Sequence, residues 1–203
     1  TTCGWMMWNW LISSLAIGST IILFDGSPFY PNNDTLWGLI DKYKITHFGI
    51  SPKYLDSSEN FKISPKLSHD LDSLKVIFST GSPLRGENFD YVYQEVKDNV
   101  RLSSISGGTD IISCFVLGNP QLPVYRDEIQ SIGLGMDVRS FNSENKSVKD
   151  IEGELICAKP FPSMPLSFWG DKDDKKHFES YFNKFPDVWY HGDFITIYDH
   201  GGV

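Results

Sequence analysis

A run of small and polar residues, Ser104-Ile105-Ser106-Gly107-Gly108-Thr109-Asp110, holds the residue types that a nucleotide site needs. Glycines have no Cβ, so the backbone can approach a purine or a phosphate closely. The Thr109 hydroxyl can hydrogen-bond a phosphoryl oxygen, and the Asp110 carboxylate can hold a divalent cation. The same run also fits an ordinary hairpin turn. Its chemistry therefore depends on what lies beside it.

A second candidate is Asp193, in the run Trp189-Tyr190-His191-Gly192-Asp193-Phe194. A carboxylate that follows a glycine can accept hydrogen bonds from both hydroxyls of a ribose. An Asx turn at the end of a strand is the alternative for Asp193. Glu154 is expected to be a structural partner and not a catalyst.

The first half of the chain alternates helical patterns with short apolar runs. We expect helices over residues 5–17, from Asp34 to Tyr43 and over 86–96, and strands over 20–24, 46–50, 75–80 and 101–106. This alternation is typical of an α/β fold with a parallel sheet and right-handed crossovers. Ligands of such sheets bind beyond the carboxyl ends of the strands. Gly81-Ser82-Pro83 and Gly107 to Asp110 both follow strands, so they are expected to line one crevice.

The second half has a different character. Short segments of alternating pattern at 111–116, 136–141, 153–158 and 189–198 predict an antiparallel sheet or a small barrel. The mixed charges of Asp171 to Lys176 predict a solvated loop. We therefore expect two parts, an α/β part over residues 1–110 and a mostly β part over residues 111–203.

Composition excludes several classes. A chain of 203 residues with 40% hydrophobic residues can bury a core. The net charge of -8 argues against nucleic acid as a partner, because binding a polyanion needs clustered lysine and arginine. Cys3, Cys114 and Cys157 are odd in number and far apart, which favours neither disulfides nor a zinc site and indicates the reducing cytosol.

The apolar stretch from Gly4 to Phe24 is long enough to raise the possibility of a membrane span. Polar residues, Asn9 and several serines, interrupt it, and no basic region precedes it. We expect a buried helix followed by a buried strand, and no membrane span.

Taken in order, the motifs resemble those of the adenylate-forming superfamily of acyl-CoA synthetases. The resemblance covers nearly the whole chain, and a series in order is far more specific than any one member. The residues that carry it are Gly4-Trp5-Met6-Met7-Trp8-Asn9-Trp10, Ser79-Thr80-Gly81-Ser82-Pro83-Leu84, Ser104 to Asp110, Leu117-Gly118-Asn119-Pro120, Pro160-Phe161-Pro162-Ser163-Met164-Pro165 and His191-Gly192-Asp193-Phe194.

The resemblance implies a two-step ligase of lipid and ketone-body metabolism that uses ATP, CoA and magnesium to activate acetoacetate through an acyl-adenylate. It implies that Thr109 hydrogen-bonds the α-phosphate, that Asp110 holds magnesium and that Asp193 binds the ribose. Many relatives carry glutamate where this chain has Asp110. The resemblance assigns the adenine walls to Gly81, Ser82 and Pro83 on one side and to Ser104, Ile105, Ser106, Gly107 and Gly108 on the other.

The acyl pocket follows from the same resemblance. Acetate-using relatives carry tryptophan at the position of Gly107, so glycine is expected to leave the volume of an indole empty for a longer acid. Trp5, Met6, Met7 and Thr80 would line the remaining wall, since methionine side chains adapt to a small keto acid. For Trp8 and Trp10 we expect core packing instead.

The chain begins at Thr1 without a methionine and stops on a turn before Val203, so we expect it to be part of a longer polypeptide. The resemblance places the glycine-rich phosphate loop upstream of Thr1 and a lysine-bearing mobile domain beyond Val203. We therefore expect the chain alone to be catalytically inactive.

Two other hypotheses about the function stay open at this point. His191, Asp193, Asp199 and His200 have side chains that bind zinc or manganese, which would suit a metal-dependent hydrolase. The chain has no HExxH motif, and it has no GxSxG motif for a serine hydrolase. The third possibility is a module that binds a nucleotide without turnover. The sequence does not indicate the oligomeric state.

Overall fold

A computed structural model describes residues 3–185 and 187–203, and these form two compact units. Unit 1 comprises the chain up to Ile21 together with residues 107–117 and 131–203. Unit 2 comprises residues 22–106 and 118–130. These boundaries differ from the expected division at residue 110, because each unit takes residues from both sides of it. The expected division into functional parts, 1–110 and 111–203, stays a prediction. Each unit is described by itself.

Unit 2 is built on a parallel sheet. In its described residues, β1 (His47–Ile50), β2 (Val76–Ser79) and β3 (Arg101–Ser104) are hydrogen-bonded in the order β1-β2-β3, all parallel. Ile50 pairs with Ser79, and Ser79 pairs with Ser104, so the three carboxyl ends coincide. The predicted α/β class with a parallel sheet is confirmed.

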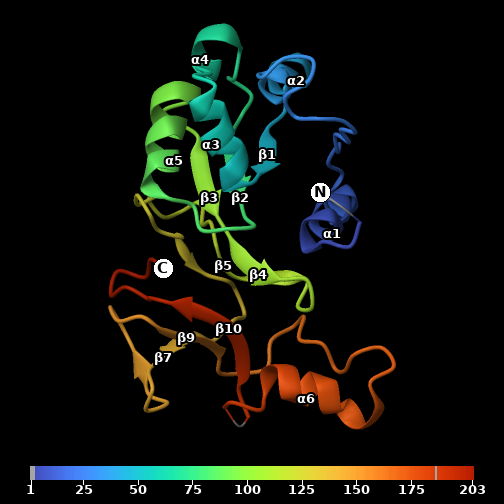
Figure 1. Cartoon of the computed structure of the whole chain (residues 1–203), viewed down its shortest axis with the longest axis vertical. Coiled ribbons are helices and arrows are strands. Elements are labelled where there is room, and N and C mark those ends of the chain that lie inside the picture. The colour runs from blue at the N-terminus through green and yellow to red at the C-terminus, as the bar shows by residue number, and fades with distance from the viewer. Residues whose placement is uncertain (1–2, 186) are drawn as a thin grey trace. The chain divides into compact units, whose positions relative to one another are not determined.

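Helices α2 (Thr35–Tyr43), α3 (Pro52–Asn60), α4 (Pro65–Ser68) and α5 (Gly86–Tyr91) belong to the same unit, and a π-helical turn, η2 (Val92–Val96), continues α5. Figure 1 shows α3 and α5 beside the strands of this sheet. Their apolar side chains share one core with the strands, because Leu55 and Val92 from the helices and Ile77 and Leu102 from the sheet are fully buried there.

Helices α3 and α4 were missed by the sequence analysis, although a signal was present. Each begins with a proline that follows a serine, at Ser51-Pro52 and Ser64-Pro65. Proline suits the first helical position because its φ is already helical and its missing N–H has no partner to lose there.

Asp34 stands at the predicted start of α2, but its side chain does not cap the helix. Its Oδ2 lies 3.0 Å from His69 Nε2 instead. The carboxylate therefore links α2 to the loop that precedes β2, a partner that no local pattern could reveal.

Unit 1 contains two sheets in its described residues. The larger has the strand order β10-β9-β7-β8 and is antiparallel at each pair, as predicted for the second half of the chain. The smaller has the order β4-β5-β6. The strands are β4 (Ser106–Gly108), β5 (Ser113–Leu117), β6 (Ser131–Ile132), β7 (Val138–Phe141), β8 (Ser147–Val148), β9 (Gly153–Cys157) and β10 (Trp189–Ile195), and the first residue of β4 belongs to unit 2.

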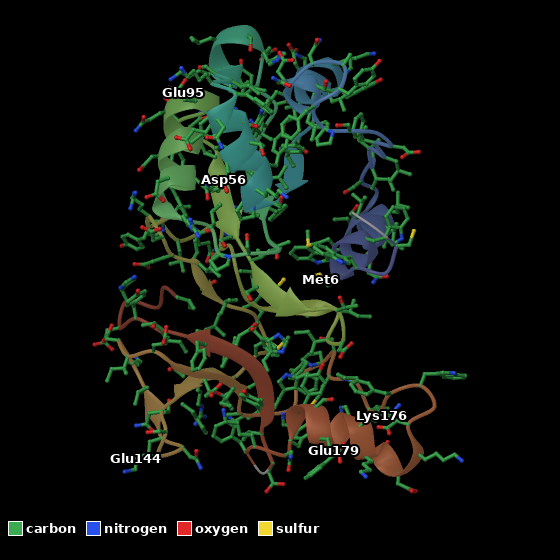
Figure 2. The ribbon with its side chains drawn as sticks, in the orientation of Figure 1. Met6, Asp56, Glu95, Glu144, Lys176 and Glu179 are labelled. Atoms are coloured by element: carbon green, nitrogen blue, oxygen red, sulfur yellow. The ribbon has the colours of Figure 1, made fainter. Side chains whose placement is uncertain are left out.

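The N-terminal segment differs from the prediction. The expected helix is present as α1 (Met6–Ser13) followed by the 3-10 turn η1 (Ser14–Ile17), and Gly18 ends it at φ +78°. The expectation of a buried helix was wrong, because Met6, labelled in Figure 2, is the buried residue of α1 among those described. Trp10, expected in a core, is also exposed. No helix among the described residues has both the length and the apolar character needed to cross a membrane.

The strand predicted over Thr20 to Phe24 is also wrong, since these residues belong to no helix or strand. Leu23 is 62% exposed and Phe24 is 43% exposed. A β-branched run forms a strand only where a neighbouring strand supplies hydrogen bonds, and the described part of the chain supplies none here.

The charge run from Asp171 to Lys176 is not a loop throughout. It contains the 3-10 turn η3 (Lys172–Asp174) and the start of α6 (Lys175–Tyr181). Both carboxylate oxygens of Asp171 accept hydrogen bonds from the backbone, at 3.1 Å from Lys176 N and 2.9 Å from His177 N. Asp171 thus satisfies two of the free N–H groups at the start of α6. Figure 2 shows Lys176 and Glu179 on α6, where both side chains are exposed.

Candidate functional site

Strand β3 ends at Ser104, the short strand β4 covers Ser106 to Gly108, and the candidate residues Thr109 and Asp110 come directly after β4. Thr109 and Asp110 are exposed, as side chains that meet a ligand must be. The Thr109 carbonyl accepts a hydrogen bond of 3.1 Å from Ile112 N, which closes the turn. Both candidate side chains therefore stand on a short turn at the start of the small sheet of unit 1.

Gly107 is packed closely against strand β5. A Cβ at this position would lie 2.1 Å from the carbonyl oxygen of Ser113 and 2.6 Å from the Cα of Cys114. The β5 backbone occupies the place of the Cβ in this structure, so there is no open space at that point beside Gly107. The role of Gly107 in making room for a longer acid stays a prediction. Glycine is needed here for the close approach of two backbones.

Asp193 lies in an irregular part of β10. Tyr190 pairs with Ile156 and Phe194 pairs with Glu154 on β9, so His191, Gly192 and Asp193 stand opposite the single residue Leu155. Gly192 has φ +93°, which favours glycine. Such a bulge changes the direction of its side chains. The Asp193 carboxylate is 58% exposed and accessible to a ligand.

His191 stands between the two candidate carboxylates. Its Nε2 lies 3.7 Å from Asp193 Oδ2, and its ring also faces Asp110 and the backbone carbonyl of Gly107. Burial lowers the pKa of His191, and the opposing effects of Asp193, the Gly107 carbonyl and Asp110 do not overcome it. The imidazole is therefore neutral at physiological pH.

The tautomer of His191 follows from Trp189. The indole Nε1–H of Trp189 donates to His191 Nδ1 at 3.4 Å. An indole nitrogen is only a donor, so Nδ1 must be the acceptor and the single proton of the neutral ring is on Nε2. The backbone of Gly107 lies beside the ring and favours its protonation.

Asp110 is held from the other side. The hydroxyl of Tyr181, at the end of α6, donates a hydrogen bond to Asp110 Oδ2. The Tyr181 ring stacks on Trp189 with 3.7 Å between centroids and 15° between planes. Tyr181, Trp189 and His191 thus join the turn that carries Asp110 to the bulge that carries Asp193. The structure brings these two predicted residues into one neighbourhood of unit 1.

Tyr181 and Trp189 were missed as parts of the site. Trp189 offers a weak signal, because residues two apart on a strand share a face and His191 is among the candidate residues. Nothing in the sequence related Tyr181 to Asp110, since the two lie far apart along the chain.

The adenine-wall candidates of unit 2 lie at the coincident strand ends. Ile105 N donates to Ser79 O at 2.9 Å, and Thr80 N donates to Ile50 O at 3.3 Å. The ends of β2 and β3, at Ser79-Thr80 and Ser104-Ile105, are therefore neighbours. The expectation that Gly81 to Pro83 and Gly107 to Asp110 line one crevice stays a prediction, because these two segments belong to different units. Gly81 has φ +96°, which permits the sharp turn after β2. Contact of these residues with adenine stays a prediction.

The acyl-pocket candidates are divided between the units. Trp5, Met6 and Met7 belong to unit 1, and Thr80 belongs to unit 2. Trp5 is 52% exposed and Met6 is buried. Their role in holding an acid stays a prediction.

The hydrolase reading gains no support. Among the described residues, no three His, Cys, Asp or Glu side chains are grouped so that they could hold a metal ion. Asp199 pairs with Lys149 at 3.3 Å, and His200 stacks on Tyr198 with 5.4 Å between ring centroids. The hydrolase hypothesis requires Asp199 and His200 to share a metal ion with His191 and Asp193, and these contacts are of a different kind.

Comparisons with known proteins agree with the geometry. The family described as "AMP-binding enzyme" matches residues 2–164. The chain is 52% identical over 203 residues to the acetoacetyl-coenzyme A synthetase of Rhizobium meliloti (strain 1021), a match that covers all of this chain and 31% of the relative. It is 51% identical to the acetoacetyl-CoA synthetase of Danio rerio over 97% of this chain and 29% of the relative.

A solved structure shows the same fold. The acetoacetyl-CoA synthetase from Streptomyces lividans matches with a TM-score of 0.93 and 39% identity, over all of this chain and 32% of that protein. The chain thus spans about a third of the length of the relatives that it matches.

Proposed function

Because the chain belongs to the AMP-binding enzyme family, we propose that it is part of an ATP-dependent ligase that joins acetoacetate to CoA. The observation that carries the proposal is the grouping of Asp110 and Asp193 around the neutral imidazole of His191. That grouping stands in a chain whose whole length is similar to acetoacetyl-CoA synthetases. The free thiols of its three cysteines are compatible with the cytosol.

The proposed reaction has two steps. A carboxylate oxygen of acetoacetate attacks the α-phosphorus of ATP, the bond between the α- and β-phosphates breaks, and pyrophosphate leaves. The sulfur of CoA, having lost its proton, then attacks the acyl carbon of the adenylate. The bond from that carbon to AMP breaks, so acetoacetyl-CoA forms and AMP leaves.

In this proposal, unit 1 holds the ribose and the α-phosphate. The two oxygens of Asp193 accept hydrogen bonds from the two ribose hydroxyls, and the Thr109 hydroxyl donates to an α-phosphate oxygen. Both side chains are exposed on segments whose backbones are fixed, one by a turn and one by a bulge. The residues from Gly81 to Pro83 and from Ser104 to Gly108 border the adenine, and Trp5, Met6, Met7 and Thr80 line the acid.

Asp110 fits the magnesium ion that this chemistry uses. Its carboxylate is exposed on the turn, and magnesium is usually held by one or two carboxylates together with phosphate oxygens and water. A bound ion would neutralise charge on the phosphates. Tyr181 occupies one carboxylate oxygen and thereby orients the group.

The role of Asp193 predicts a specific loss of AMP binding. Asp193→Asn removes the charge and one acceptor, so the Kd for AMP should rise about tenfold or more, as expected for the loss of a charge-assisted hydrogen bond. Isothermal titration calorimetry on the chain measures it. Asp199→Asn, a change to an exposed carboxylate of the same unit, should leave the Kd unchanged.

A second titration isolates the ribose contact. The variant and the wild type should bind 2′,3′-dideoxy-AMP with equal affinity, because that ligand lacks both hydroxyls. An equal loss for AMP and the dideoxy ligand would contradict the assignment of Asp193 to the ribose.

We also expect no ligase activity from these residues alone. The proposed transition state needs donors for the β- and γ-phosphates and a cation for the developing charge. By resemblance to the superfamily, a phosphate loop and a lysine-bearing domain supply them, and no segment of this chain matches either. Pyrophosphate release that depends on acetoacetate, observed with the isolated chain, would refute this expectation.

A further inference from the structure

We propose that Tyr181, Trp189 and His191 form an aromatic clamp that fixes the turn from Gly107 to Asp110 in the shape that receives the nucleotide. The clamp itself is argued from the geometry of unit 1, and its service to a nucleotide rests on the proposed function. Its members are positioning residues, since they act through the turn.

The first arm of the clamp is Tyr181. Its hydroxyl donates to Asp110 Oδ2, and its ring lies flat on Trp189, which is 1% exposed. Stacking on a buried indole prevents the phenol ring from swinging away. A carboxylate only accepts hydrogen bonds, so the phenol hydroxyl of Tyr181 is the donor to Asp110.

The second arm is His191, which acts at the opposite end of the turn. Trp189 leaves the proton of the neutral ring on Nε2. The backbone of Gly107 lies beside the ring and favours its protonation, so His191 contacts this end of the turn. The ring is held edge-on to Phe115 at 4.8 Å between centroids. Its Cε1 would lie only 3.0 Å from a Cβ on Gly108, so the imidazole also fills the space beneath that glycine.

Trp189 joins the two arms. The same indole stacks on Tyr181 through its face and donates to His191 through its edge. Further rings surround it, with Phe161 at 5.5 Å and Phe182 at 5.9 Å between centroids. A residue held this firmly can fix the positions of both polar groups at once.

The turn needs such support. Apart from the contact with Tyr181, the hydrogen bond that holds Thr109 and Asp110 among the described residues is the one that the Thr109 carbonyl accepts from Ile112 N. Exposed glycine-rich turns have many conformations. Fixing one of them before a ligand arrives removes an entropic cost from binding. Groups behind the contacting residues commonly have this effect on affinity.

Hydrogen exchange of the whole chain, followed by mass spectrometry, tests the clamp without any ligand. Tyr181→Phe keeps the stacking and removes one hydroxyl, and His191→Leu removes the imidazole that contacts Gly107. Each should speed amide exchange of residues 108–112 by about threefold to tenfold, the effect of one lost hydrogen bond. His191→Gln, which can still donate from the position of Nε2, should restore slow exchange.

Tyr190→Phe is the matched control. It removes a hydroxyl from the same strand, one that lies 3.4 Å from Lys184 Nζ and does not contact the turn. Exchange at residues 108–112 should match the wild type in this variant. Unchanged exchange in both Tyr181→Phe and His191→Leu would overturn the clamp, as would an equal increase in Tyr190→Phe or an increase spread over all of unit 1.

Titration with AMP then separates the clamp from the proposed function. If the wild type binds AMP, Tyr181→Phe and His191→Leu should bind it about threefold to tenfold more weakly, and His191→Gln should recover most of the affinity. Equal affinity in all variants would refute the role of the clamp in nucleotide binding. Failure of the wild type to bind AMP would refute the proposed function, while the exchange result would still decide whether the clamp exists.

Discussion

Replacement of Gly107 by alanine is expected to disrupt the small sheet of unit 1 and to abolish AMP binding. The added Cβ would lie 2.1 Å from the carbonyl oxygen of Ser113, and this neighbour is backbone, so no side chain can rotate away to relieve the overlap. Strand β5 must move. Forcing extra atoms into a packed site costs about 1–3 kcal/mol and sometimes more.

The measurement is urea unfolding by circular dichroism together with AMP titration. Because Gly107 begins the turn that carries Asp110, a shift of β5 should also displace the Tyr181 and His191 contacts. Loss of AMP binding should therefore accompany the loss of stability.

Gly49→Ala is the matched control, since Gly49 is also a strand glycine but has no atom within 4 Å of the place of a Cβ. Alanine restricts the unfolded chain more than glycine does, so this variant should be as stable as the wild type or slightly more stable. A Gly107→Ala variant with wild-type stability would show that β4 and β5 are not in the close contact described.

Trp37→Ala should unfold much of unit 2. Trp37 is fully buried, and it contacts Phe48 and Tyr54 at 5.5 and 5.7 Å between ring centroids. Removing a buried tryptophan costs about 3–5 kcal/mol, through lost apolar contact and the cavity that remains. Alanine is the better helix former, so α2 itself gains nothing from tryptophan and the entire loss is one of packing.

Hydrogen exchange locates this loss. Exchange should accelerate in β1, β2, β3 and the helices of unit 2, because their side chains share the core that contains Trp37. Trp169→Ala is the control, since Trp169 is fully exposed, and it should leave exchange unchanged. Wild-type exchange in Trp37→Ala would mean that the helices and the sheet do not share one core.

Local sequence patterns predicted the strands correctly where the folded chain supplies a neighbouring strand to pair with. The segments predicted as strands at 46–50, 75–80 and 101–106 are strands β1 to β3 within two residues at each end. Of the three, Val76 to Ser79 fits the near-continuous apolar pattern of a strand buried in a parallel sheet. The loops after them then had to meet at one edge. The neighbouring positions of Ser79 and Ser104 follow from that topology.

Local patterns failed where a partner far along the chain decides the structure. Thr20 to Phe24 has the composition of a strand, but a strand needs a neighbour. Asp34 has the type and position of a cap, but His69 offers its carboxylate another contact. The charge run that contains Asp171 predicts a solvated loop, although the Asp171 side chain accepts hydrogen bonds from two N–H groups at the start of α6.

The α/β class, the parallel pairing in the first half and the antiparallel pairing in the second could be predicted from hydrophobic period, and the candidate side chains from residue chemistry. The order of the strands within each sheet came from the folded chain. Only the tertiary structure decided that Gly107 is glycine to admit the β5 backbone, and that Tyr181, Trp189 and His191 stand between Asp110 and Asp193. The reason is physical: a hydrogen bond between residues distant along the chain exists only when folding brings them together, and no short window of sequence records that distance.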